Sequence, residues 1–444
     1  MSRFGIVGGG MLGMTLAWNL SKAGHEVTIF EGAERCGGLA APWELGDAVW
    51  DRHYHVTLGS DTALRALLRE LDVESEINWV KVGTGFFVDG AMHPFSSVFD
   101  YLRFPPLSPV QKLRLAATIL KASRIRAWEP LEELTAVEWL TQECGRATVE
   151  RIWLPLLRAK LGPYATRASA AFIWAIIARM YAARANGAKS ESFGYVRRGY
   201  DRILRRFEER LAERGVEIRT RHAIERVGSD GSGGVAIVTA DGPHRFDRAV
   251  VTMAAPLAGR LCPELTEHER ALCAGVEYQG IVCASILSDV GLTPYYITNI
   301  ADASVPFTAV IEMTALVDKQ EFGGKSLVYL PKYVASDDPA LFRSDEEIAS
   351  SFIPALQRMH PQFDSRSIRA FRVSRVRYVF PIPTVGYSRR LPPVRTSVPG
   401  LFMAGSAHIV NGTLNVNETV KLANGLVPAL LAEEPAAPQR LATV

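Results

Sequence analysis

Apolar residues follow two different periods along the chain. Short apolar runs lie at 4–7 and 27–30, and the segment 11–23 between them carries apolar residues at helical spacing. A strand, a helix and a second strand in about 30 residues predict a βαβ unit with parallel strands. The chain therefore begins with the building unit of a doubly wound α/β fold.

The same periods predict a helix-rich middle and a strand-rich later part. Ser108 and Pro109 form a typical helix start, an N-cap followed by proline at the first helical position. The pattern predicts helices at 61–71, 135–144, 148–161, 169–184, 201–214, 345–359 and 417–431. It predicts strands at 281–287, 295–300, 308–313, 326–330, 368–379 and 401–404, and a hairpin within 78–95 that Gly90 closes.

The turn after the first strand reads Gly8-x-Gly10-x-x-Gly13. The first glycine allows a tight turn, the second lets the backbone approach a pyrophosphate, and the third allows the helix to pack closely on the strand. Glu31 ends the second strand, where an acid can accept hydrogen bonds from ribose hydroxyls. This full context favours a dinucleotide site over a glycine-rich turn without a ligand.

A second glycine pair, Gly37 and Gly38, follows directly after the ribose acid. It allows another close backbone approach to a long ligand, as FAD requires. The stretch 6–39 resembles the start of the flavin amine oxidase superfamily, which includes protoporphyrinogen oxidases, phytoene-type desaturases and UDP-galactopyranose mutases. Non-covalent FAD is implied, because the last cysteine is Cys283 and attachment through a cysteine near the C-terminus is excluded.

The resemblance also implies which residues contact the cofactor. They are Gly8, Gly10, Met11, Leu12, Gly13, Glu31, Gly32, Arg35, Gly37, Gly38, Leu39, His53, Ile224, Ala254, Gly405, Ser406, Asn417 and Glu418. Two features depart from the family pattern. Ser406 stands where an acid or amide often follows the glycine, and the segment 411–418 lacks the small residues common there.

A chain of 444 residues is longer than a single hydrophobic core usually supports, so two domains are expected. With the resemblance, we expect a discontinuous Rossmann-type FAD-binding domain and an α+β substrate-binding domain. The first covers 1–85, 195–260 and 391–444. The second covers 86–194 and 261–390, with a helical part at 105–184 and a mixed β-sheet part at 276–380.

Three residues are candidates for the reaction centre. By resemblance, His53 and His55 lie beside the flavin ring, and on a strand residues at i and i+2 would share one face. A packing role for these histidines stays open. No metal site is predicted, because zinc needs three or four ligands and no Cys/His cluster accompanies the pair. Lys332 is the third candidate, since a lysine linked through water to the flavin recurs in amine oxidases.

Composition narrows the class of protein. A net charge of +3, from 50 basic and 47 acidic residues, gives no indication of a nucleic-acid partner. Five cysteines without a C-x-x-C pair indicate reduced thiols and a cytoplasmic location. We recognise no secretory signal and no stretch of roughly 18 apolar residues. The basic amphipathic segment 111–128 leaves open a solvated helix face or peripheral contact with an anionic membrane.

Together these features predict an FAD-dependent oxidase or dehydrogenase. It would remove a hydride from a C–H bond next to nitrogen, or at an allylic position, of a small and largely apolar molecule. A redox-neutral sugar-nucleotide mutase is an alternative, with Arg372, Arg375 and Arg377 as candidate diphosphate ligands. A non-catalytic FAD-binding protein is a second alternative. The substrate, the electron acceptor and the oligomeric state are not predicted.

Overall fold

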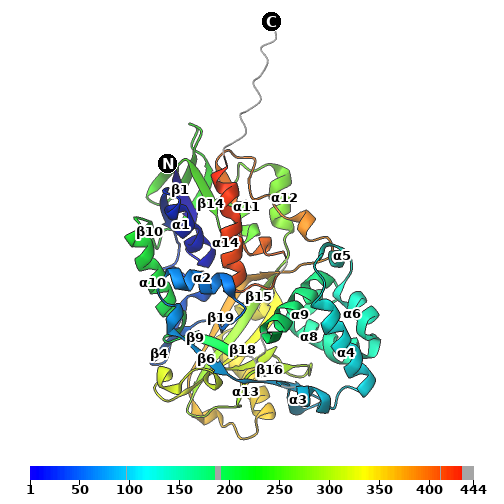
Figure 1. Cartoon of the computed structure of the whole chain (residues 1–444). Helices are drawn as coiled ribbons and strands as arrows, with labels where there is room; N and C mark the ends of the chain where they lie inside the picture. Colours follow the sequence, from blue (N-terminus) through cyan, green and yellow to red (C-terminus); the bar gives the residue numbers. More distant parts are fainter. Residues whose placement is uncertain (97, 186–191, 411, 433–444) are drawn as a thin grey trace.

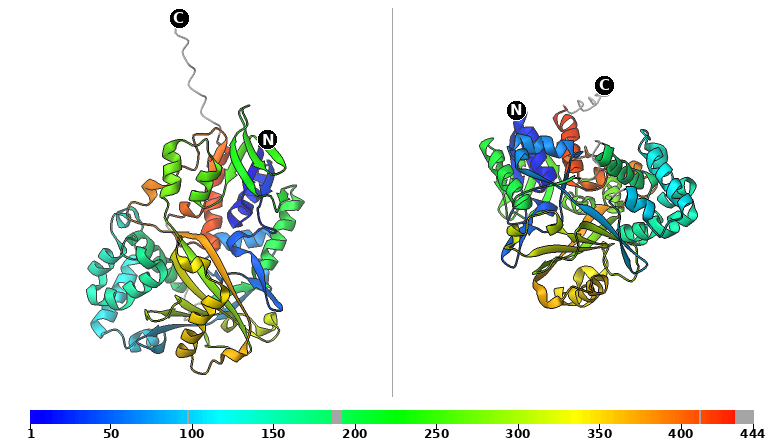
Figure 2. Two further views of the ribbon diagram at one scale, coloured as in Figure 1. Left: turned by 180° about the vertical axis from the view of Figure 1, so that it is seen from behind. Right: turned by 60° about the horizontal axis from the view of Figure 1, so that its bottom comes forward.

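The computed structural model describes residues 1–96, 98–185, 192–410 and 412–432. The chain forms three neighbouring parts (Figure 1): a parallel-sheet part, a seven-stranded-sheet part, and a group of helices beside the latter. Two further views (Figure 2) show the helical group on one flank and helices α1 (Met11–Lys22) and α10 (Gly199–Glu213) on the other. The seven-stranded sheet lies between these flanks.

The parallel-sheet part has five strands in the order β10-β2-β1-β14-β20, and every neighbouring pair is parallel. The strands are β1 (Arg3–Val7), β2 (Glu26–Phe30), β10 (Glu217–Arg219), β14 (Arg248–Val251) and β20 (Leu401–Met403). This topology confirms the predicted Rossmann-type α/β fold. The chain enters the sheet from distant parts of the sequence, as a discontinuous unit does.

Side chains of this sheet alternate between two cores, as the period of a strand requires. Ile6, Val250 and Phe402 pack with α1, α10 and α14 (Val416–Leu431) on one face. Val7 and Val251 pack on the other face with a three-stranded antiparallel sheet of β11 (Ile224–Ser229), β12 (Val235–Thr239) and β13 (Gly242–Phe246). Both faces are buried, which explains the nearly continuous apolar runs in these strands.

The second part is a seven-stranded sheet in the order β19-β15-β18-β17-β16-β7-β8. Its strands are β7 (Gly83–Val88), β8 (Ala91–Pro94), β15 (Tyr278–Ser288), β16 (Tyr295–Ile300), β17 (Ala309–Glu312), β18 (Ser326–Ala335) and β19 (Ile368–Pro381). Helix α13 (Asp345–Met359) packs on one face, with the predicted bounds. Asp89 and Gly90 close the β7–β8 hairpin with φ angles of 54° and 72°, as a two-residue turn of this kind requires.

Short strands connect the two sheets. Strands β3 (Pro42–Leu45) and β4 (Ala48–Asp51) form a hairpin. Strands β5 (Thr57–Leu58), β6 (Ile77–Lys81) and β9 (Ser192–Val196) form a small sheet, and α2 (Thr62–Glu70) lies between β5 and β6 in sequence. Because β6 belongs to the small sheet and β7 to the seven-stranded sheet, the chain enters the seven-stranded sheet after Val82.

The helical group contains α4 (Pro109–Ala122), α6 (Ala136–Cys144), α8 (Leu154–Leu161) and α9 (Ala170–Ala185), with α3 (Val98–Arg103), α5 (Glu129–Glu132) and α7 (Arg146–Thr148) as short connections. Helices α11 (Ala255–Leu261) and α12 (Glu267–Gly275) follow β14. Ser108 caps α4 through a capping box with Gln111, as predicted from its position. Within the described residues, no helix combines the length and apolar character needed to cross a bilayer.

The helix predicted at 148–161 is interrupted. Residues Val149–Trp153 form a π-helical turn, and α8 begins only at Leu154. Pro155 gives a physical reason, because it has no N–H to continue the ladder of i to i−4 hydrogen bonds. The break lies next to the cavity described below.

Candidate functional site

A cavity of about 1360 Å³ runs from the glycine turn after β1, between the two sheets, into the helical group. Its walls include Gly8 and Gly10 at one end, and Trp153, Leu156 and Phe172 at the other. The cavity is therefore longer than a dinucleotide groove alone and continues into an apolar pocket.

The glycine motif has the geometry that its spacing predicts. Gly8 has a φ of +108°, which side chains rarely allow. A Cβ on Gly13 would lie 2.0 Å from the carbonyl oxygen of Gly8, so α1 packs directly on the turn. A Cβ on Gly10 would meet no protein atom closer than the Cα of Gly38, at 3.9 Å. The space over Gly10 is thus open to a ligand rather than filled by protein.

The second glycine pair lies beside the first turn. The amide of Gly37 donates to the carbonyl of Gly9 over 2.8 Å, and Gly37 has a φ of +123°. Glu31 is fixed at the same place, since its carboxylate accepts from the amides of Gly9 and Ala33, both over 2.8 Å. These contacts hold an acid at the cavity wall, one residue beyond β2.

Most residues expected to contact the cofactor line this cavity. They are Gly8, Gly10, Met11, Leu12, Glu31, Gly32, Gly37, Gly38, Leu39, His53, Ile224, Ala254, Ser406 and Asn417. Residues from widely separated stretches of the sequence are thereby brought together. Gly13 and Gly405 lie behind the wall and shape it through their backbone.

The expected cofactor contacts of Arg35 and Glu418 are not supported. Arg35 instead forms an ion pair of 2.7 Å with the buried carboxylate of Asp201 on α10. Glu418 accepts hydrogen bonds from Asn417 and Lys421 and does not line the cavity. Both side chains are committed to structural roles.

Asn417 has a role that the sequence does not reveal. Its side-chain oxygen accepts from the amides of Ala63 and Leu64, over 3.0 and 3.1 Å. Those are first-turn amides of α2, which an N-cap normally satisfies. Asn417 thus ties α14 to α2 at the cavity wall, across 354 residues of sequence.

The segment from Arg52 to Val56 is a loop and not the expected strand, since β4 ends at Asp51 and β5 begins at Thr57. Because the strand alternation is lost, His53, Tyr54 and His55 all line the cavity. The hydroxyl of Tyr54 lies 3.0 Å from that of Tyr333. Sequence reasoning missed Tyr54, which lies between the two expected histidines.

His53 is held in one tautomer. Its Nδ1 lies 3.1 Å from the carbonyl oxygen of Leu39, which can only accept, so Nδ1 carries the proton. Its Nε2 accepts from the Ser374 hydroxyl over 3.1 Å. Burial lowers the pKa of His53 to about 3, so the ring is neutral at physiological pH.

His55 differs in its surroundings. Its Nδ1 lies 3.6 Å from a carboxylate oxygen of Asp51, which is too long for a strong hydrogen bond. Burial raises the pKa of Asp51, and its carboxylate also accepts from the Tyr200 amide over 2.7 Å. Among the residues described, no three His, Cys, Asp or Glu side chains come together as metal ligands would.

The buried neutral state of His53 predicts a pH dependence of stability. Its pKa is about 3 in the folded chain and 6.5 unfolded, so the unfolded chain takes up the proton first. The stabilisation is complete above pH 6.5 and is lost as the pH falls toward 3. Between pH 6.5 and about 5, the free energy of unfolding should fall by about 2 kcal/mol more in wild type than in His53→Gln. Urea denaturation of both proteins measures this, and an equal pH dependence would contradict it.

Lys332 does not line the cavity, contrary to its expected catalytic role, whereas its neighbour Tyr333 does. Successive residues of a strand point to opposite faces, and β18 presents Tyr333 to the cavity. Among the described lining residues the lysine is instead Lys160 on α8, whose Nζ lies 3.9 Å from the centre of the Tyr333 ring. Its place near the C-terminal end of α8 gave no signal in the sequence.

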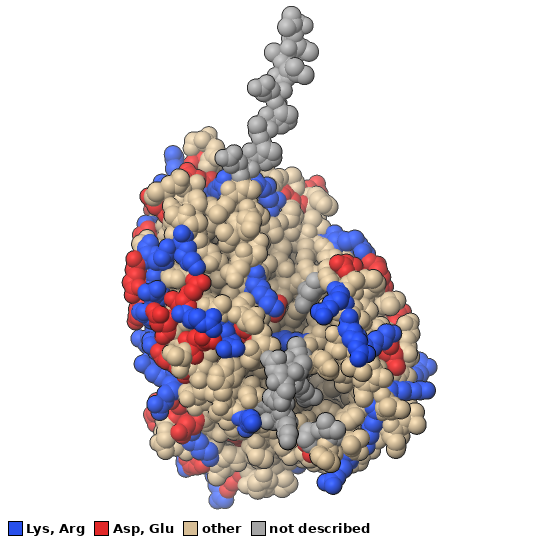
Figure 3. Space-filling model, viewed as in Figure 1, with Lys and Arg blue, Asp and Glu red and all other residues tan. Residues whose placement is uncertain are grey.

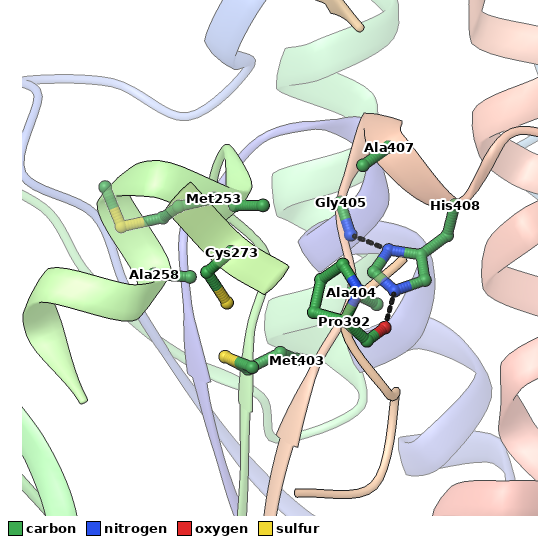
Figure 4. A pocket seen from close by; sticks show the side chains of 10 residues that line it. Met253, Ala258, Cys273, Pro392, Met403, Ala404, Gly405, Ala407 and His408 are labelled. Carbon is green, nitrogen blue, oxygen red and sulfur yellow. Dashed lines mark hydrogen bonds between the residues drawn. The ribbon is translucent and has the colours of Figure 1, made fainter. Parts of the chain in front are cut away.

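The loop after β20 is fixed by His408, which sequence reasoning also missed (Figure 4). Its Nδ1 accepts from the amide of Gly405, and its Nε2 donates to the carbonyl of Pro392, both over 3.1 Å. A Cβ on Gly405 would lie 2.5 Å from the carbonyl oxygen of Met253. The contacts around Gly405 hold Ser406 at the cavity wall.

The three arginines of the mutase alternative do not converge. Arg372 donates to the carbonyl of Glu44 over 2.7 Å and lies on the Trp43 ring. Arg375 forms an ion pair of 2.8 Å with Asp345. Only Arg377 of this group lines the cavity. These three arginines therefore do not form a pair that could hold a diphosphate.

A family model described as flavin-containing amine oxidoreductase matches residues 12–417. The chain belongs to this family. The match confirms the family that the stretch 6–39 resembles and implies a flavin cofactor.

The individual relatives are distant in sequence. The chain is 24% identical over 261 residues to zeta-carotene desaturase of Synechocystis sp., covering 53% of each protein. It is 28% identical over 128 residues to 15-cis-phytoene desaturase of Synechococcus elongatus, covering 29% of this chain and 26% of that protein. The chain thus spans about half or less of these relatives. A solved protein from Exiguobacterium sp., provisionally described as a protoporphyrinogen oxidase, shares the fold with a TM-score of 0.76 at 19% identity, covering 96% and 98% of the chains.

Proposed function

We propose that the protein binds FAD in the cavity and oxidises a C–H bond of a small, largely apolar molecule, next to nitrogen or at an allylic position. The observation that carries this proposal is the continuity of the cavity. The glycine turns that suit a dinucleotide and the pocket lined by Trp153 and Phe172 belong to one continuous cavity. A cofactor held at the turns would reach a molecule in the pocket.

The residues present fit FAD. The pyrophosphate would lie over Gly10, where a Cβ is absent, at the positive end of α1. Glu31 would hold the ribose, and Ile224 and Ala254 would flank the adenine. The amino end of α14, beside Ser406, would favour negative charge on the reduced ring.

The flavin, when bound, supplies the chemistry of accepting a hydride. The chain's own part is to bind, orient and exclude water. His53 is a poor base, because its pKa is about 3 and both ring nitrogens have partners. We propose His55 as a contact to flavin or substrate, since it lines the cavity. Catalysis then rests on position and not on a protein base.

Anaerobic reduction of the FAD-loaded protein tests the proposal. Amines, polyenes, porphyrinogens and sugar nucleotides would each be mixed with the protein, and the oxidised flavin absorption followed. At least one amine or unsaturated compound should bleach the flavin. Conversion of a sugar nucleotide only after the flavin has first been reduced would support the mutase instead. A flavin that stays bound and oxidised with every compound would overturn the oxidoreductase.

Peripheral contact with an anionic membrane through 111–128 is also proposed. Leu113 on α4 is 73% exposed and Phe99 on α3 is 72% exposed. The two helices are joined, because Lys112 donates from Nζ to the Leu102 carbonyl over 2.6 Å. Figure 3 shows Lys and Arg predominating over the helical group on this face. Exposed apolar and basic side chains together suit an anionic bilayer surface.

Substitution of the exposed apolar pair tests this contact. Phe99→Asp combined with Leu113→Asp should weaken binding to vesicles of phosphatidylcholine and phosphatidylserine by about 10-fold or more. Phe342→Asp is the matched control, because Phe342 is 78% exposed on the seven-stranded-sheet part. Vesicle co-sedimentation measures both variants. A wild-type protein that stays in the supernatant would contradict the proposal.

A further inference from the structure

Lys160 places a cation in the wall of the cavity. It projects from α8, next to the cavity residues Leu156 and Leu157, and its Nζ lies over the Tyr333 ring at 3.9 Å. The Tyr333 hydroxyl in turn lies 3.0 Å from that of Tyr54. The lysine is half-buried, and an aromatic face compensates only part of the lost hydration.

No carboxylate in the described lining is available to Lys160. Among the described lining residues, two carry a carboxylate, Glu31 and Asp61. Glu31 is held by the amides of Gly9 and Ala33 at the glycine turn. Asp61 forms an ion pair with Arg179 over 3.1 Å and accepts from the Leu58 amide over 2.8 Å. The positive charge of Lys160 is thus left for a ligand.

The charged side chains that line the cavity also limit which ligands the pocket can bind. A protonated amine would meet Lys160 and would find no free carboxylate among the described lining residues. A diphosphate would need more than one enclosed cation, whereas the described lining arginines are either exposed, as Arg260 and Arg377 are, or paired with Asp61, as Arg179 is. A single carboxylate on an apolar molecule satisfies both the lysine and the walls.

We infer that the substrate is an apolar molecule carrying a carboxylate, and that Lys160 receives this group. The inference rests on the proposed function for the reaction and names its substrate class. Lys160 acts here as a specificity residue. It binds the acid and leaves the chain of the substrate in the pocket that leads to the glycine turns.

Binding of a fluorescent polyene acid tests the inference. Cis-parinaric acid and its methyl ester would be titrated against the FAD-loaded protein, with probe fluorescence as the readout. Wild type should bind the acid about 10-fold or more tightly than the ester. The ratio should fall to about 1 in Lys160→Met and should persist in Lys160→Arg. Lys160→Gln repeats the neutral test if the methionine variant does not fold.

Arg377→Met is the matched control, because it removes an equal charge from an exposed cavity residue. This variant should change the ratio of acid affinity to ester affinity by less than about 2-fold. An acid preference that survives in the neutral Lys160 variants, or that falls equally in Arg377→Met, would overturn the inference. The readout does not depend on flavin reduction. If Lys160 sets the preference for the acid but no compound reduces the flavin, only the proposed oxidation is contradicted. If a compound reduces the flavin but Lys160 does not set the preference for the acid, only the role of Lys160 is contradicted.

Discussion

Gly10→Ala should leave the chain folded and weaken its affinity for FAD by about 100-fold or more. Gly10 has a φ of −73°, which alanine adopts without strain, and its added Cβ would meet no protein atom within 3.8 Å. The methyl group would instead occupy the space where the pyrophosphate approaches the backbone. Isothermal titration of the cofactor-free variant with FAD measures the loss.

The matched control is Gly425→Ala. Gly425 is exposed on α14, and its added Cβ would meet nothing within 4 Å. This variant carries the same extra methyl group away from the cavity and should bind FAD as wild type does. Unchanged FAD affinity in Gly10→Ala would mean that the cofactor does not lie over this turn.

Gly13→Ala should destabilise the protein itself. The new Cβ would lie 2.0 Å from the Gly8 carbonyl oxygen and 3.2 Å from Cγ2 of Ile6. A backbone oxygen in a tight turn cannot move aside as a flexible side chain can, so α1 must shift from the sheet. We expect the free energy of unfolding to fall by about 3 kcal/mol or more.

Urea denaturation without cofactor measures the effect of Gly13→Ala separately from flavin binding. Gly10→Ala serves as its comparison, because both variants add one methyl group to the same motif. An unchanged denaturation midpoint in Gly13→Ala would contradict the close packing of helix on turn. The two variants thus separate the ligand role of the motif from its structural role.

The parts of the fold that the sequence predicts are those set by local signals. The βαβ unit follows from the spacing of Gly8, Gly10 and Gly13, and α4 begins where Ser108 and Pro109 predict. Helix α13 has the predicted bounds because Ser344 and Glu347 form a capping box. Each of these signals lies within a few residues of the element that it starts.

The parts that the sequence does not predict depend on register and on distant contacts. In β18 the residues before Lys332 are buried on both faces, so no polar alternation tells which of Lys332 and Tyr333 faces the cavity. Lys160, Tyr54 and Tyr333 come from three separate segments and meet only in the fold. Asn417 lies in the first turn of α14, yet its side-chain oxygen accepts hydrogen bonds from two first-turn amides of α2.

Titration of the cofactor-free protein with FAD and with FMN tests the central claim most directly. FMN carries the same ring but lacks the adenylate that Glu31 and the Gly10 turn are expected to hold. We predict one FAD per chain, bound about 100-fold or more tightly than FMN. Equal affinity for the two flavins, or no binding of either, would contradict the account.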